Sequence, residues 1–193
     1  MSETRMAQME VLLPRIMPQV LPCPRSMALD AIQMVAVDFC KETGVWKEVF
    51  TETVCSCDVV IPVSVPRDAV LAGVSALYLD QDRVQTSEYQ VASRDIMLLF
   101  TPQNHASVTV EATLRPVRTA VTLPEEILEE WGDVIAHGVI ARLKSMSGMK
   151  IEWTDPQGAV MHNELYNEGC AAAREQKFRR RFGGGIMYVN SGD

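Results

Sequence analysis

The pattern of apolar and polar residues predicts a long amphipathic helix near the start of the chain. Between residues 25 and 43, apolar side chains recur at steps of three and four, which places them on one helical face. Pro24 suits the beginning of such a helix, and Gly44 suits its end. The apolar face consists of Ala28, Ile32, Val35, Ala36, Phe39 and Cys40.

Residues 47–117 have a different pattern, with alternating and β-branched runs that predict strands. Residues 80–82 indicate a hairpin tip, and residues 101–104 indicate a turn between the last two strands. The short connections favour antiparallel pairing. Residues 107–114 alternate cleanly, so one face of this strand should be covered and the other exposed to water.

Two more helices are predicted after the strands. The first covers residues 123–146, with Thr122 as a candidate cap and two glutamates in its first turn. The second begins at Thr154 or Asp155 and continues into a basic segment. Small residues at 136, 138 and 141 predict close approach of a neighbouring helix. The expected packing face of the last helix is Met161, Leu165, Gly169, Ala172 and Ala173.

The fold class predicted from these patterns is α+β. We expect a bundle of three long helices with an antiparallel β-rich insertion and an extended C-terminal tail. Repeated prolines between residues 14 and 24 argue against a long helix at the N-terminus. The predicted parts are an irregular proline-rich arm (1–24), a helical bundle (25–46 and 118–182), the β-rich insertion (47–117) and a flexible tail (183–193).

Composition indicates one medium-sized globular domain, since 47% of the 193 residues are hydrophobic. We find neither an export signal nor a membrane span, and expect the five cysteines to be free thiols in a cytosol. The net charge is −7, yet residues 174–182 contain five basic residues and one acidic residue. This asymmetry is typical of an acidic body with a basic attachment segment.

No residue pattern indicates catalysis, a cofactor or a metal. The three histidines lack the spacing of metal ligands, and Cys55 and Cys57 have no second Cys/His pair, so a strand could simply bury both. The glutamates at 125, 126, 129 and 130 are explained by the helix dipole and a solvated face. The glycines at 183–185 follow a helix, unlike a phosphate loop, and favour a hinge. We therefore predict that the chain is not an enzyme.

The segment Phe178–Phe182 is the sharpest candidate for binding. Phenylalanine anchors and arginines suit docking on a partner protein with carboxylates. A solvated helix end with basic residues near the negative end of the dipole is an equally good interpretation. Contact with nucleic acid comes third, because the rest of the chain is acidic.

The order of these segments resembles a known family. Ala31–Trp46 (AIQMVAVDFCKETGVW), Leu123–Trp131 (LPEEILEEW) and Ala136–Leu143 (AHGVIARL) are similar to the first helices of the head–tail adaptor, or connector, proteins of tailed bacteriophages. Tyr166–Arg174 (YNEGCAAAR) and the exit at Arg181–Gly184 are similar to the last helix of that family. The resemblance covers roughly residues 28–184.

This resemblance implies a structural virion protein at the head–tail junction, assembled in the host cytoplasm. Such a protein forms a dodecameric ring beneath the portal protein, extends the DNA channel without sequence-specific binding, and offers a surface for the tail or nozzle protein. The alternative is a cytosolic nucleic-acid-binding module that uses the basic segment. Carried to this chain, the portal- or partner-docking residues are Lys177, Phe178, Arg179, Arg180, Arg181, Phe182, Ile186 and Tyr188.

Overall fold

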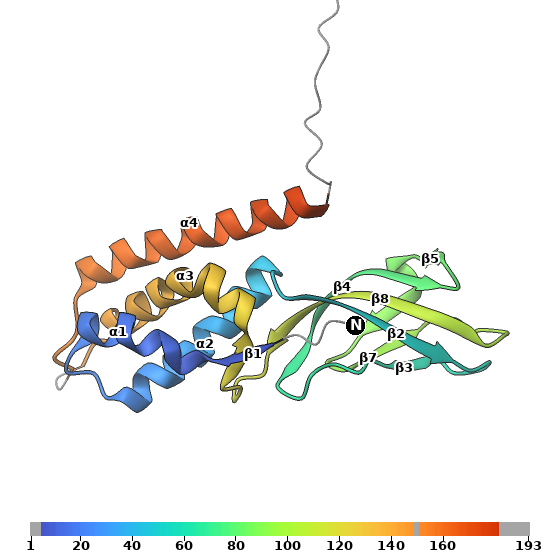
Figure 1. Cartoon of the computed structure of the whole chain (residues 1–193), viewed down its shortest axis with the longest axis horizontal. Helices are drawn as coiled ribbons and strands as arrows, with labels where there is room; N and C mark the ends of the chain where they lie inside the picture. The colour runs from blue at the N-terminus through green and yellow to red at the C-terminus, as the bar shows by residue number, and fades with distance from the viewer. Residues whose placement is uncertain (1–4, 149–150, 182–193) are drawn as a thin grey trace, which may run out of the picture.

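The computed structural model describes residues 5–148 and 151–181 and shows an elongated chain with two halves (Figure 1). The helical half contains the helices and a small sheet, and the β half contains strands β2 to β8. The helical half is built from β1 (Met6–Gln8), the 3₁₀ helix η1 (Met9–Leu12), α1 (Leu13–Val20), α2 (Arg25–Thr43), β9 (Thr122–Pro124), α3 (Glu125–Lys144) and α4 (Pro156–Arg181). The β half is built from β2 (Lys47–Val54), β3 (Val60–Pro62), β4 (Ala69–Leu79), β5 (Asp82–Val84), the 3₁₀ helix η2 (Thr86–Glu88), β6 (Tyr89–Val91), β7 (Asp95–Leu98) and β8 (Ala106–Pro116).

Helix α2 has the bounds that its sequence predicts. Gly44 ends it in the left-handed conformation, with φ 61°, and its N–H donates to the Cys40 carbonyl at 2.9 Å. Glycine adopts this conformation without the steric cost of a Cβ. The predicted apolar face is buried, and Phe39 and Ile32 are fully inaccessible to solvent. The apolar periodicity is sufficient to predict α2 because a helix makes its own backbone hydrogen bonds.

The predicted bundle of three long helices is wrong. The described residues form an α+β fold with four α-helices and nine antiparallel strands in three sheets. The additional helix, α1, lies in the segment expected to be irregular. Pro14 occupies its first turn, where the missing N–H has no partner to lose, and Pro18 lies on its exposed side. Burial of an apolar stripe stabilises α1 despite these prolines: Leu13, Ile16 and Val20.

The N-terminal segment is held along the start of α3. Strand β1 pairs antiparallel with β9, with Gln8 opposite Thr122. Arg5 forms an ion pair with Glu125 at 3.0 Å, and its carbonyl accepts a hydrogen bond from the Glu125 N–H at 2.8 Å. Thr122 is therefore a strand residue and not the predicted helix cap, and α3 begins after Pro124 without a side-chain cap.

Strands of the β half form two sheets that pack on one another. The four-stranded sheet has the order β2-β8-β4-β5, and the three-stranded sheet has the order β3-β7-β6. Every pair is antiparallel, which confirms the predicted direction. Lys47 lies opposite Thr113, so the first and last strands of this half are neighbours. The inner faces bury Leu77 and Val110 from one sheet and Ile61 and Ile96 from the other.

Two local predictions in the β half are confirmed. Asp80 and Gln81 connect β4 to β5 with φ 46° and 82°, the two positive values of a tight type I′ hairpin turn. Strand β8 alternates between buried and less buried residues up to Ala112. Thr113 breaks the alternation because its hydroxyl donates to the Gly73 carbonyl at 3.2 Å.

One buried cluster of side chains continues from the helical half into the β half. Trp46 and Leu114 lie at the junction, where the Leu114 N–H donates to the Trp46 carbonyl at 2.8 Å. Both side chains are 2% exposed or less. The two halves therefore share a hydrophobic core.

Candidate partner-binding site on helix α4

Helix α4 begins at a network of polar contacts. Asp155 accepts hydrogen bonds from the Gly158 N–H at 2.9 Å and from the Lys144 Nζ at 3.0 Å. The Gly158 bond and then Lys144 hold the pKa of Asp155 below its ordinary value. A Cβ at position 158 would lie 2.2 Å from the Asp155 carboxylate and would displace it from this network. This confirms Asp155 as the cap and attaches the start of α4 to the end of α3.

Helices α3 and α4 pack antiparallel and very close together. A Cβ at Gly138 would lie 2.7 Å from the Tyr166 ring and 2.8 Å from Val35. A Cβ at Gly169 would lie 2.4 Å from Val134. The close approach predicted from small residues is therefore confirmed. The geometry leaves no space for any side chain at the two crossing points.

The buried face of α4 differs from the predicted one. Met161 and Leu165 were expected to pack in the core, yet they are 52% and 39% exposed. Gly169 and Ala173 pack as predicted, whereas Ala172 is exposed. A histidine and a tyrosine take the places expected for the large apolar residues. The residues that face α3 and α2 are Ala159, His162, Tyr166, Gly169, Cys170 and Ala173.

Helix α4 consequently has exposed apolar side chains along its first half. Val160 is 60% exposed, beside Met161 and Leu165. Val160 also lines an open groove of about 1070 Å³ between α2, α3 and α4. Carboxylates from α2 and α4 surround this groove, including Asp38, Glu42 and Glu164. A groove with an apolar floor and charged walls can accept an apolar side chain or helix from another protein.

The histidines at 137 and 162, which showed no metal-ligand spacing, meet between α3 and α4. Their Nδ1 atoms lie 2.9 Å apart, and His162 is 6% exposed. Burial lowers the pKa of His162, and the neighbouring His137 and Lys144 lower it further, while Asp155 acts in the opposite direction. Sequence reasoning missed this contact because the residues are 25 positions apart. Only the antiparallel register of the two helices brings them together.

Other titratable groups in this region are held in their neutral forms. Burial raises the pKa of the Tyr166 hydroxyl, and Cys170, Glu42 and Asp38 raise it further. Burial also raises the pKa of the Cys170 thiol, and that of Cys40 to about 12. These thiols behave as small apolar side chains, as their positions on helical faces predicted. None of them is poised as a nucleophile.

The predicted docking residues at 177–181 lie in the last turns of α4. This placement agrees with the expectation that the last helix continues into the basic segment. Phe182, Ile186 and Tyr188 lie outside the described residues. Upstream of the segment, Arg174 forms an ion pair with Glu42, and Gln176 donates to Glu130. These contacts hold α4 on α2 and α3 immediately before the basic residues.

A second exposed apolar surface lies on the outer face of the three-stranded sheet. Val60 pairs with Met97 across β3 and β7, and Leu99 follows two residues later. The three side chains are 49%, 41% and 52% exposed. Sequence reasoning treated these strands only as part of the insertion. The available signal was their continuous apolar character, since a short strand with few polar residues cannot bury both faces under a single neighbouring sheet.

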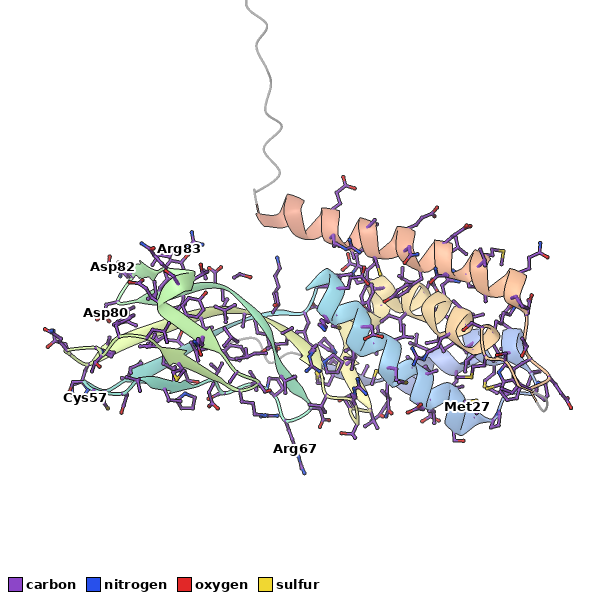
Figure 2. All side chains as sticks on the ribbon, turned by 180° about the vertical axis from the view of Figure 1, so that it is seen from behind. Met27, Cys57, Arg67, Asp80, Asp82 and Arg83 are labelled. Atoms are coloured by element: carbon purple, nitrogen blue, oxygen red, sulfur yellow. The ribbon has the colours of Figure 1, made fainter. Side chains whose placement is uncertain are left out.

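The remaining candidates from the sequence do not form a catalytic or metal site. Cys55 and Cys57 are exposed in a turn, not buried in a strand, and Cys57 lies at the outer end of the β half (Figure 2). All five cysteines are free. Within residues 5–148 and 151–181, no three His, Cys, Asp or Glu side chains gather closely enough to hold a metal ion. In the same part of the chain, no helix is long and apolar enough to cross a bilayer.

No model of a known protein family matches the chain, and no curated protein shows significant similarity to it.

Proposed function

We propose that the chain is a head–tail adaptor of a tailed bacteriophage. It is a structural virion protein that forms a ring beneath the portal, extends the DNA channel and presents a surface to the tail or nozzle. The ordered resemblance of its helical segments to connector proteins motivates this proposal.

The observation that carries the proposal is the pair of exposed apolar surfaces. One lies on the first half of α4, and the other on the three-stranded sheet at the opposite end of the long axis (Figure 1). Contiguous exposed apolar side chains on a soluble domain are typical of binding surfaces. Ring subunits need two different surfaces, because head-to-tail interfaces join unlike patches and close by rotation. An adaptor needs further surfaces for the portal and the tail.

Helix α4 suits the role of an attachment element. Its beginning is fixed by Asp155 and its middle by the glycine crossings with α3. Its last turns contain Lys177–Arg181, so the basic segment continues the same helix. Docking of this segment on acidic side chains of the portal would bring the ring onto the head.

The test is co-expression with the portal protein encoded in the same phage genome. Negative-stain electron microscopy should show rings on the portal, and limited proteolysis should show protection of residues after Arg174. Replacing Arg179, Arg180 and Arg181 together by alanine should abolish the protection. Arg67→Ala with Arg83→Ala is a control for lost positive charge outside the segment: it removes two charges from the β half, where Figure 2 shows both residues.

The absence of both rings and protection would contradict the proposal. A salt-sensitive gel shift with DNA or RNA that is lost in the triple-alanine variant would instead favour the nucleic-acid-binding module. Met161→Gln and Leu165→Gln should leave the fold intact, because both residues are exposed. Loss of rings in these variants would place α4 in the contact between subunits.

A further inference from the structure

We infer that the contact between His137 and His162 is a pH-sensitive latch that holds α4 on α3. The proposal goes beyond the adaptor function and does not depend on it. It concerns the helix that carries the basic segment, and it rests on the geometry of two imidazole rings in a buried helix crossing.

The 2.9 Å separation of the two Nδ1 atoms requires a hydrogen bond between unlike partners. One ring must carry a proton on Nδ1 and donate it, while the other must keep Nδ1 unprotonated and accept it. The pair can take up one additional proton on the donor ring without losing this bond. A second proton removes the acceptor and places two positive rings in contact.

His162 is the ring that resists protonation. It lies at 6% exposure on the buried face of α4, whereas His137 is half-buried on α3. The charged groups acting on it come from the end of α3 and the start of α4: Lys144 repels a proton, and Asp155 attracts one. One turn further along, Asp38 and Glu42 of α2 face Tyr166. Lys144 and Asp155 form an ion pair at 3.0 Å, and their opposite effects on His162 leave Lys144 with the larger influence.

The direction of the pH effect follows from linkage. The folded pKa of His162 lies below its ordinary value of 6.5. Above pH 6.5, His162 is neutral in both the released and the latched state, so the latch contributes its full stability. As the pH falls below 6.5, a released His162 takes up a proton that the latched one refuses. The latch therefore weakens until His162 is protonated in the folded chain as well.

The fold around the rings makes local release of α4 the response. Helix α4 is held on its neighbours by glycine crossings, small side chains and the Tyr166 ring. Its further contacts near the end, Arg174 with Glu42 and Gln176 with Glu130, are exposed to solvent. The neighbouring cluster of α1, α2 and α3 buries its own apolar side chains, including Leu12, Ile16 and Ile32. When the histidine contact weakens, α4 should therefore separate from α3 while the rest of the chain stays folded.

Cysteine labelling of the full chain tests the latch. Cys170 lies on the buried face of α4, Cys23 is buried between α1 and α2, and Cys55 is exposed in the β half. Rates of modification by 4,4′-dithiodipyridine are measured by peptide mass spectrometry from about pH 7.5 to about pH 5.5. Cys55 reports the intrinsic reactivity of a thiol at each pH, and Cys23 reports global unfolding.

We expect the rate at Cys170 relative to Cys55 to rise by up to about tenfold per pH unit below 6.5, because release is coupled to one proton. The rate at Cys23 should stay low. His162→Gln should flatten the rise, because an amide can serve as donor or acceptor without acquiring charge. His137→Gln should only reduce the rise, because burial still lowers the pKa of His162 in that variant. His105→Gln is the matched control, because this third histidine is exposed outside the helices, and it should keep the wild-type response.

Three results would overturn the latch. The first is a relative rate at Cys170 that does not change with pH in the wild-type chain. The second is the same rise in both glutamine variants as in the wild type. The third is parallel labelling of Cys23 and Cys170, which would mean global acid unfolding.

Discussion

The helical half and the β half are stabilised over different distances along the chain. In the helical half, each helix forms its own hydrogen bonds, and the tertiary contacts then decide which face is buried. In the β half, even the hydrogen bonds depend on distant segments, since β2 pairs with β8 and β3 pairs with β7. A sequence pattern therefore carries more information about the first half than about the second.

The two halves also differ in what they expose. The helical half presents apolar side chains on one long helix, beside a groove whose walls carry charges of both signs, such as Glu42 and Arg142. The β half presents them on the outer face of a short sheet. Each surface is fixed by a core that continues through Trp46 and Leu114. This continuity predicts that the halves respond as one unit to damage in either.

The largest expected effect is loss of a core side chain. Phe39 is fully buried in α2, with ring centroids 6.1 Å from Trp131 and 6.4 Å from Tyr166. Phe39→Ala should lower the free energy of unfolding by about 3–5 kcal/mol, and Ile96→Ala in the β half by about 2–5 kcal/mol. Urea denaturation followed by circular dichroism at 222 nm measures the helices, and amide exchange of β8 measures the sheet.

Both probes should shift together in both variants, because the core is shared. A variant that changes the stability measured by the probe of its own half alone would contradict this expectation. It would show that the two halves unfold independently.

A smaller effect is expected at the helix crossings. Gly138→Ala should lower the free energy of unfolding by about 1–3 kcal/mol, because its methyl group would overlap Tyr166 and Val35. Gly132→Ala on the same helix is the matched control. Its methyl group would meet the ends of two side chains, Leu12 at 3.2 Å and Arg15 at 3.6 Å, which can move aside. The better helix propensity of alanine should therefore stabilise this variant by up to about 1 kcal/mol.

Thermal unfolding of the two variants separates these contributions. Equal stability of both would mean that α4 can shift away from α3 at little cost. The close packing that distinguishes the helical half would then be unimportant.

The smallest effect is expected in a turn of the β half. Cys57 has φ 80°, a conformation that suits glycine, and its N–H donates to the Pro102 carbonyl at 3.1 Å. Cys57→Gly should raise the free energy of unfolding by about 0.5–1 kcal/mol through relief of local strain. Chemical denaturation with the reducing agent present gives the difference directly.

Cys55→Gly is the control, because Cys55 is not among the residues with positive φ. It should destabilise the chain slightly by increasing the freedom of the unfolded state. If both variants lose stability, the turn at Cys57 is not strained.

By itself, the sequence determined the parts whose physics is local. The bounds of α2, the glycine at its end and the hairpin turn at residues 80–81 follow from neighbouring residues. For the cap of α4 the sequence left two candidates, Thr154 and Asp155, and the hydrogen bond to Gly158 identifies Asp155. Prolines misled the prediction for α1, because burial of its apolar stripe outweighs the single hydrogen bond that Pro18 removes.

Only the tertiary structure decided which strands pair, which side of α4 is buried and that His137 meets His162. Met161 and Leu165 have the composition of core residues, yet the tight glycine crossing with α3 rotates the helix so that they remain exposed. The physical reason is that each of these features depends on which remote parts of the chain come together in space. Local propensity and periodicity describe neighbouring residues and carry no information about such contacts.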